Sequence, residues 1–449
     1  MGTEHKTLAL LLSCLAAAIG AQAHADILIE NVNLIDGTGR PIVKGASVLI
    51  EGDRISQVGV AKIKAPSGAE RIDGRGKYLA PGFMDLHVHL QGGTKISKDG
   101  LRQVDSDRRA GLQALHSYLY SGVTTVFDAG NNPDHIFALR AEERDEKIHS
   151  PRIFATGGIV TYPGSHGSFE GATLVDDWPE AIPALDEHIA RRPDILKLTL
   201  EERGWGARPL IPLLPLDLLE NIVQYYNDHG IRTTIHTAGE RRARQAIFAG
   251  VDTLAHPVIV GPITEAFARL MGAKRIPMVT TLTIGENYAR LAEHPEYLDQ
   301  ALYQAVLPHD EIERLRGEVS EEYAERSWTW WMKIMTPIAQ ENVRMIHAAG
   351  GILALGTDQT IGPAVHREME LLVAAGIPTS EVIRIATLNG AIFLGKEREL
   401  GSIEIGKLAD MVLLEADPIA DIDNAKRIVQ VIKGGKIIDR SKLDLPVNE

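Results

Sequence analysis

Hydrophobic and polar residues alternate near both ends of the chain. From residue 27 to about residue 78, β-branched residues alternate with polar ones, as in ILIENVNLID and ASVLIEGDRISQVG, with Gly or Asp turns between the runs. The segments GSIEIGKLADMVLLEADP and IVQVIKGGKIID have the same pattern close to the end of the sequence. We therefore predict that residues 26–79 and 396–449 pair in a small antiparallel sheet and form one β-sandwich domain.

The middle of the chain, residues 80–395, follows a different pattern. Short apolar runs alternate with amphipathic stretches that often end in Gly, as in SGVTTVFDAG and HGIRTTIHTAG, which is typical of βα units. Eight strands separated by helices predict an α/β fold of the (β/α)8 TIM-barrel type. The candidate strands are Met84–His89, Thr124–Asp128, Ile153–Thr156, Ile195–Leu200, Thr233–His236, Thr253–His256, Met278–Leu282 and Leu353–Asp358.

The stretch between the seventh and eighth predicted strands is unusually long. It contains the segment SWTWWMKIM, with Trp328, Trp330 and Trp331 close together. We interpret these tryptophans as residues that pack a helix. A lid or a subunit contact is the alternative interpretation.

Composition narrows the classes of function. A chain of 449 residues with 44% hydrophobic and 24% charged positions is expected to bury a large core. Its formal net charge of -13 argues against a nucleic-acid partner, because such proteins need a concentrated basic surface. After the N-terminal segment the sequence has no second long apolar run, so we expect no membrane insertion of the mature chain. The sequence leaves the oligomeric state open, a homo-oligomer included.

Residues 1–25 have the layout of a secretory signal peptide. Lys6 precedes an apolar run, and small residues follow at Ala21, Ala23 and Ala25. We therefore expect cleavage after Ala23 or Ala25 and a periplasmic or secreted protein. An uncleaved anchor and a lipoprotein modified at Cys14 are the alternatives. Cys14 is the only cysteine, so the cleaved chain would contain no thiol.

Candidate metal ligands stand at the ends of the predicted strands. His87 and His89 lie two residues apart in GFMDLHVH, so both side chains of this strand face the same side and can reach one metal ion. His236, His256 and Asp358 end three later strands, on the face where TIM barrels assemble their active sites. Each alone also fits an ordinary role, as a hydrogen-bonded core histidine or a helix cap.

Lys197 is out of place in the otherwise apolar strand DILKLTL. An unpaired ammonium group buried there would cost several kcal/mol. A salt bridge to a neighbouring carboxylate is one explanation. The other is that the neutral amine adds carbon dioxide, and that the resulting carbamate bridges two cations roughly 3.5–4 Å apart.

The complete pattern resembles the binuclear amidohydrolases, in particular the imidazolonepropionase-like and prolidase-like branch. The resemblance covers almost the whole mature chain, including APGFMDLHVH, GTD at 356–358 and GSIEIGKLADMVLL. It implies that His87 and His89 bind one metal and that His236 and His256 bind the other. It further implies that carboxylated Lys197 bridges the two ions and that Asp358 completes the first site and is catalytic. Zinc is the expected metal, although such ligands also accept manganese, cobalt or iron.

The resemblance also implies an activity. A hydroxide that bridges the metals would attack a small-molecule substrate, which we expect to be a dipeptide or an N-acyl amino acid cleaved at its C–N amide bond. A cyclic amide, a lactone or a phosphoester is the alternative substrate, and a metal-free binding or scaffold protein is the non-enzymatic alternative. Loops after the strands offer three candidate substrate contacts, each of which could instead face solvent: Tyr162, His166 and Arg203.

Overall fold

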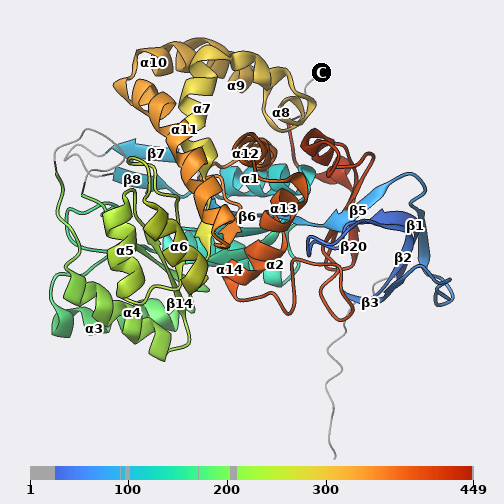
Figure 1. Cartoon of the computed structure of the whole chain (residues 1–449), viewed down its shortest axis with the longest axis horizontal. Coiled ribbons are helices and arrows are strands. Elements are labelled where there is room, and N and C mark those ends of the chain that lie inside the picture. Colours follow the sequence, from blue (N-terminus) through green and yellow to red (C-terminus); the bar gives the residue numbers. More distant parts are fainter. Residues whose placement is uncertain (1–25, 92, 97–101, 170, 203–209, 447–449) are drawn as a thin grey trace, which may run out of the picture.

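The computed structural model describes residues 26–446 except 92, 97–101, 170 and 203–209 (Figure 1). The predictions made for residues 1–25, including Cys14, and for Arg203 lie outside this part of the chain. A search of the described residues finds no helix with the length and apolar character needed to cross a membrane.

Segments from both ends of the chain share one sheet, on the right of Figure 1. The strand order is β20-β19-β18-β5-β1-β2-β3, and β4 pairs with β1. The prediction of an antiparallel sheet is wrong for two pairs, because β1 runs parallel to β4 and to β5. The bounds are β1 Ile27–Leu34, β2 Val43–Glu51, β3 Arg54–Gly59, β4 Glu70–Asp73, β5 Tyr78–Pro81, β18 Met411–Leu414, β19 Ile428–Lys433 and β20 Lys436–Ile438.

This terminal sheet folds over on itself. Ile55 N donates to Lys407 O at 2.9 Å, and Ala409 N donates to Asp53 O at 2.8 Å, so the β3 end of the sheet meets the segment that leads into β18. Residues from β1, β2, β5, β18 and β19 form a buried apolar cluster of their own. The predicted β-sandwich thus takes the form of one curled sheet around its own small core.

All eight strands predicted for the middle of the chain are present. They form a sheet β10-β9-β6 and a second sheet that includes β13-β14-β15-β16-β17, with parallel pairing throughout. The sixth, seventh and eighth are shorter than predicted, because their regular pairing ends at Leu254, Val279 and Ala354. After the seventh, helix α7 begins at Leu282. The bounds are β6 Phe83–Val88, β9 Val123–Asp128, β10 Arg152–Ala155, β13 Ile195–Thr199, β14 Arg232–His236, β15 Thr253–Leu254, β16 Met278–Val279 and β17 Leu353–Ala354.

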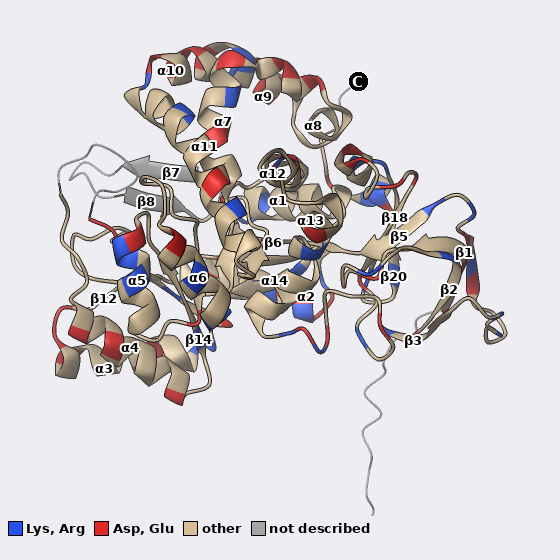
Figure 2. Cartoon of the chain, in the orientation of Figure 1, with Lys and Arg blue, Asp and Glu red and all other residues tan. Residues whose placement is uncertain are grey.

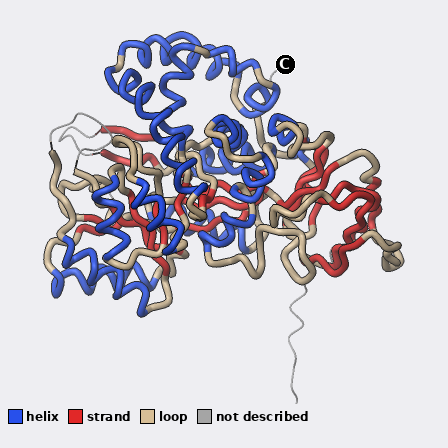
Figure 3. Tube along the Cα trace, in the orientation of Figure 1, coloured by secondary structure: helices blue, strands red, loops and turns tan. Residues whose placement is uncertain are grey.

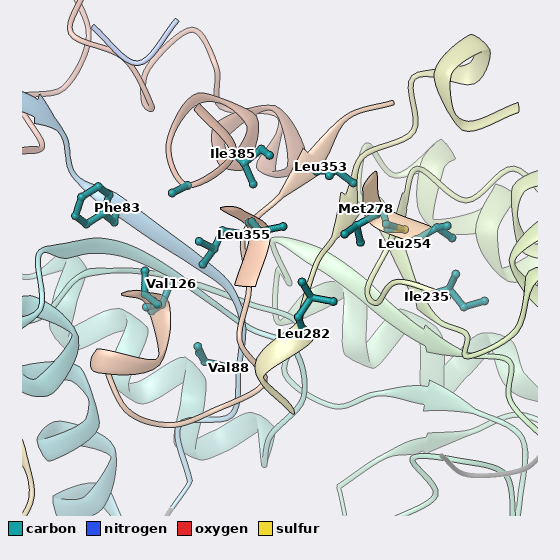
Figure 4. Packing of buried hydrophobic residues seen from close by; sticks show 14 of the residues in the cluster. Phe83, Val88, Val126, Ile235, Leu254, Met278, Leu282, Leu353, Leu355 and Ile385 are labelled. Carbon is teal, nitrogen blue, oxygen red and sulfur yellow. The ribbon is translucent and has the colours of Figure 1, made fainter. Parts of the chain in front are cut away.

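Backbone hydrogen bonds join the two parallel sheets at both of their facing edges. Asp194 N donates to Ala155 O at 2.9 Å, which links the start of β13 to β10. Leu86 N donates to Leu355 O at 3.0 Å, which links β6 to the residue after β17. The eight strands therefore follow one another in chain order, and Figure 4 shows apolar side chains such as Val88, Ile235 and Leu355 packed among them.

Helices separate the parallel strands, as the alternation of patterns predicts (Figure 3). Three short pairs of strands were not predicted: β7 (Gly93–Ile96) with β8 (Arg102–Asp105), and β11 (Val160–Thr161) with β12 (Thr173–Leu174) and with β13. The helices are α1 Arg108–Tyr120, α2 Pro133–Arg144, α3 Trp178–Ala190, α4 Leu216–Asp228, α5 Glu240–Phe248, α6 Glu265–Lys274, α7 Leu282–Glu293, α8 Ala301–Val306, α9 His309–Arg314, α10 Ser320–Glu325, α11 Ser327–Ala348, α12 Pro363–Ala374, α13 Thr379–Ile385 and α14 Leu388–Leu394.

Helices α7 to α11 fill the long stretch between β16 and β17 and rise above the parallel strands at the top of Figure 1. We call residues 282–348 the helical insertion. It has a separate apolar cluster that includes Leu291, Leu298 and Ile312. Figure 2 shows acidic and basic residues side by side on this insertion and on the terminal sheet.

Candidate active site

All six predicted metal ligands line one cavity of about 950 Å³. His87, Lys197 and His236 lie on β6, β13 and β14, whereas His89, His256 and Asp358 follow the ends of β6, β15 and β17. Parallel strands bring their carboxyl ends to the same edge, which explains why residues so far apart in sequence meet here.

His87, His89 and Asp358 form the tightest group. Asp358 Oδ1 lies 3.4 Å from His89 Nε2 and 3.9 Å from His87 Nε2. One ligand atom from each of the three residues lies within 4.8 Å of the other two, so the group could hold a metal ion.

The other two histidines extend this group. The ring of His256 lies 4.3 Å from that of His87, and the ring of His236 lies 4.6 Å from that of His256, both measured between centroids. His87, His236 and His256 are each at most 2% exposed. Four imidazoles and a carboxylate are thus gathered in one site, in which the side chains of His89 and Asp358 are 26% and 17% exposed.

Hydrogen bonds at Nδ1 orient three of these rings. His87 Nδ1 lies 3.1 Å from Ala255 O, His89 Nδ1 lies 2.7 Å from Gly130 O, and His256 Nδ1 lies 3.1 Å from Thr281 Oγ1. Ring orientation through the distal nitrogen is characteristic of histidines that ligate metals. With imidazole nitrogens and a carboxylate as donors, the residues present fit a divalent transition metal.

Lys197 is 3% exposed and lies within the cluster, with Nζ 3.4 Å from His87 Nε2. No carboxylate of the described residues forms an ion pair with it, so the salt bridge considered as one explanation is not seen there. Burial lowers the pKa of Lys197 from 10.5 to about 7, against the opposing influence of Asp358 and Asp128. A substantial fraction of this amine is therefore neutral near pH 7.

Asp358 has an unusual backbone and an ionised side chain. Its φ of 53° is in the left-handed region, and its N–H donates to His87 O at 2.8 Å. Burial acts to raise the pKa of Asp358, but the nearby His87 and His89 overcome this and lower it to about 2. Burial also lowers the pKa of His87, His236 and His256 well below 6.5. Burial acts to lower the pKa of His89 as well, but the hydrogen bond with Asp358 and the charge of Asp358 outweigh burial and raise it. The site thus combines a carboxylate with three imidazoles whose neutral form is favoured, and a metal ion requires neutral imidazoles.

Of the candidate substrate contacts, the structure places one in the cavity and another outside it. His166 lines the cavity, and its ring stacks on that of His236 with centroids 4.0 Å apart and an interplanar angle of 8°. Its carbonyl oxygen accepts from Thr199 Oγ1 at 2.7 Å, which holds the loop against β13. Tyr162 instead packs against the hydrophobic core and is not one of the described residues that line the cavity.

Several buried carboxylates support the site, and two of them, Asp85 and Asp128, were missed. Asp128 accepts from Leu90 N at 2.8 Å, and Asp85 accepts from Thr357 Oγ1 at 2.6 Å, so they tie together the segments that carry His89 and Asp358. Glu368 accepts from Leu282 N at 2.9 Å, just after Thr281. Asp128 could have been found from the sequence, because it ends the second predicted strand as Asp358 ends the eighth.

Residues 78–438 match the amidohydrolase family. The chain belongs to this family. It is 22% identical over 434 residues to an imidazolonepropionase of Micrococcus luteus, an alignment that covers 86% of this chain and 92% of that protein. The family places the protein among hydrolases that act on carbon–nitrogen bonds and generally bind divalent metals.

Solved structures agree in fold. A Xaa-Pro dipeptidase with methionine bound in its active site superimposes with a TM-score of 0.72 and 25% identity, covering 92% of this chain and all of that chain (100%). Molinate hydrolase superimposes with a TM-score of 0.72 and 23% identity, covering 95% and 97% of the two chains. These relatives place the chain in the imidazolonepropionase- and prolidase-like branch and imply a TIM-barrel domain with a β-sandwich.

Proposed function

We propose that this amidohydrolase binds two divalent metal ions and cleaves the C–N amide bond of a dipeptide or an N-acyl amino acid. One observation carries the proposal: His87, His89, Lys197, His236, His256 and Asp358 all line the same cavity. The methionine bound by the Xaa-Pro dipeptidase supports a substrate with an amino-acid half.

His87, His89 and Asp358 would hold one ion, and His236 and His256 would hold the other. Lys197 would bridge them as a carbamate, since its neutral Nζ can attack the carbon of CO2 and lose one proton. Its burial without a carboxylate partner in the described structure supports this role. Zinc is the metal we propose.

Bound metal ions would supply a water molecule with its pKa lowered toward about 7 and would polarise the substrate carbonyl. Asp358 would accept the proton of that water on its carboxylate and then donate it to the leaving nitrogen. His166, stacked on His236 at the cavity wall, would donate a hydrogen bond to the substrate. The left-handed backbone at Asp358 keeps its carboxylate beside His89 throughout.

A screen of the full chain, supplied with zinc or manganese and bicarbonate, tests the proposal. We expect two metal equivalents per chain and hydrolysis of dipeptides or N-acyl amino acids. Isotope-labelled bicarbonate should give a carbamate signal that is missing from Lys197→Met. Absence of bound metal would revive a binding or scaffold role, and hydrolysis restricted to lactones, cyclic amides or phosphoesters would favour the alternative substrates.

We further infer that residues 1–25 direct export and are then removed, and that residues 80–395 form the catalytic domain between the two halves of the terminal sheet. N-terminal sequencing of the protein from the periplasm or medium tests the first inference. A chain that starts at its initiator Met and remains in the cytoplasm would overturn it.

A further inference from the structure

One wall of the cavity is built by the helical insertion and is rich in aromatic residues. Tyr288 of α7 and three tryptophans of the first turns of α11, Trp328, Trp330 and Trp331, line the same cavity as the metal ligands. We call these four residues the aromatic wall. Their interpretation from sequence as helix-packing residues therefore covers only part of their role.

Neighbouring rings hold the aromatic wall in place. Tyr288 meets Trp328 edge-on, with centroids 6.2 Å apart and an interplanar angle of 81°, and lies 4.9 Å from the ring of Tyr323. Trp328 and Trp331 also pack against the hydrophobic core. Tyr288, Trp328 and Trp331 are thus preorganised, which lowers the entropic cost of binding a ligand to the wall.

One tryptophan of the wall presents a large apolar surface. Trp330 is 65% exposed, although it lines the cavity. An apolar surface exposed in a cavity is a feature that a bound ligand would cover.

We propose that the aromatic wall binds a large, flat apolar group, so that the preferred substrates are amides in which one half carries an aromatic ring. The identity of the cleaved bond rests on the proposed function, whereas binding to the wall rests on the cavity alone. Offset or edge-on contacts between that group and the indole ring would cover Trp330. A small aliphatic dipeptide would leave this wall uncovered in a cavity of about 950 Å³.

Paired substrates test the proposal by activity. The kcat/KM of the full, metal-loaded chain is measured for N-benzoylglycine against N-acetylglycine and for glycylphenylalanine against glycylalanine. We expect the aromatic member of at least one pair to be preferred, and Trp330→Ala to reduce that preference about tenfold. Phe248→Ala is the matched control, because Phe248 is a 69% exposed aromatic residue of α5 outside the cavity. A preference that is absent, or equal in Trp330→Ala and the wild type, overturns the proposal.

A binding experiment tests this inference independently of the proposed function. Titration of N-benzoylglycine and N-benzyl-N′-phenylurea into the Asp358→Asn chain is followed by tryptophan fluorescence and calorimetry. If either compound binds, and its affinity falls about tenfold when Trp330→Ala is added, the result supports the proposed role of the aromatic wall even if no amide is hydrolysed. If neither compound binds, or if the affinity is unchanged by Trp330→Ala, the proposed role of the aromatic wall is overturned even if small amides are good substrates.

Discussion

Asp358 combines a left-handed backbone with a carboxylate shared by two histidines. A non-glycine residue in this conformation costs about 1–3 kcal/mol and persists where the surrounding structure enforces it. Here the enforcing contacts are the hydrogen bond to His87 O and those of Thr357 with Asp85. The left-handed backbone thus lowers the stability of the folded chain, and in this conformation Asp358 Oδ1 lies beside His89 Nε2.

Asp358→Asn tests the proton-transfer role of this residue. The amide keeps an oxygen for a metal but cannot accept the proton, so we expect kcat/KM to fall by at least about 100-fold. Metal analysis of the same protein should still find most of the metal. Turnover close to that of the wild type would remove Asp358 from this role.

His366 predicts how stability responds to acid. It is 2% exposed, its Nε2 lies 2.9 Å from Ser121 O, and burial lowers its pKa from 6.5 to about 4. Between pH 6.5 and about pH 4 the unfolded chain binds a proton here and the folded chain does not, so the free energy of unfolding falls as the pH falls. The full loss is about 3 kcal/mol.

Denaturant titrations between about pH 7 and pH 4, with a chelator present, measure this loss. The buried histidines of the site add to the acid sensitivity, so the informative comparison is with His366→Gln, whose amide can still donate to Ser121 O. We expect a shallower dependence on pH in this variant. An unchanged pH profile would mean that burial does not lower the pKa of His366 in the folded chain.

The residues of the site were predictable because their signal is local. A histidine, lysine or aspartate that interrupts or ends an apolar strand can be read without knowledge of the partner strands. The packing of Tyr162 against the core and the contacts of Glu368 with Leu282 and Thr283 depend on how loops and helices return to the parallel strands, so the sequence did not determine them. The pairing of His166 with His236 also depends on a loop conformation and is not encoded by spacing.

At the scale of elements, β17 is held very close to β6 and β16. A Cβ atom on Gly356, just after β17, would lie 2.3 Å from Val279 Cγ1 and 3.0 Å from His87 N. Valine is stiff at χ1 and cannot swing away easily. This close approach sets the position of the segment that ends at Asp358.

Gly356→Ala should therefore push that segment away from β6. We expect the free energy of unfolding to fall by about 1–3 kcal/mol and turnover to fall with it. Gly317→Ala is the control, because a Cβ atom there has no neighbour within 4 Å. Equal stability of the two variants in chemical denaturation would show that the strands can separate without penalty.

In the helical insertion, the hydrophobic pattern predicted a helix but could not predict what its tryptophans contact. Tryptophans three residues apart on a helix fit a core and a cavity wall equally well, because both bury one face. Parallel pairing of β1 with β4 and β5 was missed for a related reason. Alternation identifies the strands, but their direction relative to one another depends on connections of many residues.

At the scale of the molecule, a buried ion pair joins the terminal sheet to the parallel strands. Asp410, next to β18, accepts from Arg152 Nε of β10 at 2.7 Å and from Gly434 N at 2.6 Å. The side chains of Arg152 and Asp410 are 21% and 6% exposed. This contact adds to apolar packing between the two parts, since the main hydrophobic cluster includes Val412 and Val431 of the terminal sheet.

Asp410→Ala would leave Arg152 largely buried without its carboxylate, so we expect a loss of about 3 kcal/mol in the free energy of unfolding. Lys436→Ala is the control, since it breaks the exposed pair of Lys436 with Glu146 and should cost less than about 1 kcal/mol. Similar thermal shifts for both variants would contradict a structural role for the buried pair.

The position of β5 between β1 and β18 has a consequence for the order of folding. When a ribosome has made only the first half of the chain, β5 can pair with β1, but its other edge has no strand to bind. That edge stays open until residues 411–414 have been synthesised. The terminal sheet is therefore completed only after the whole parallel-strand region has been made, and the chain that lacks residues 411–414 is the form most exposed to chaperones and to premature aggregation.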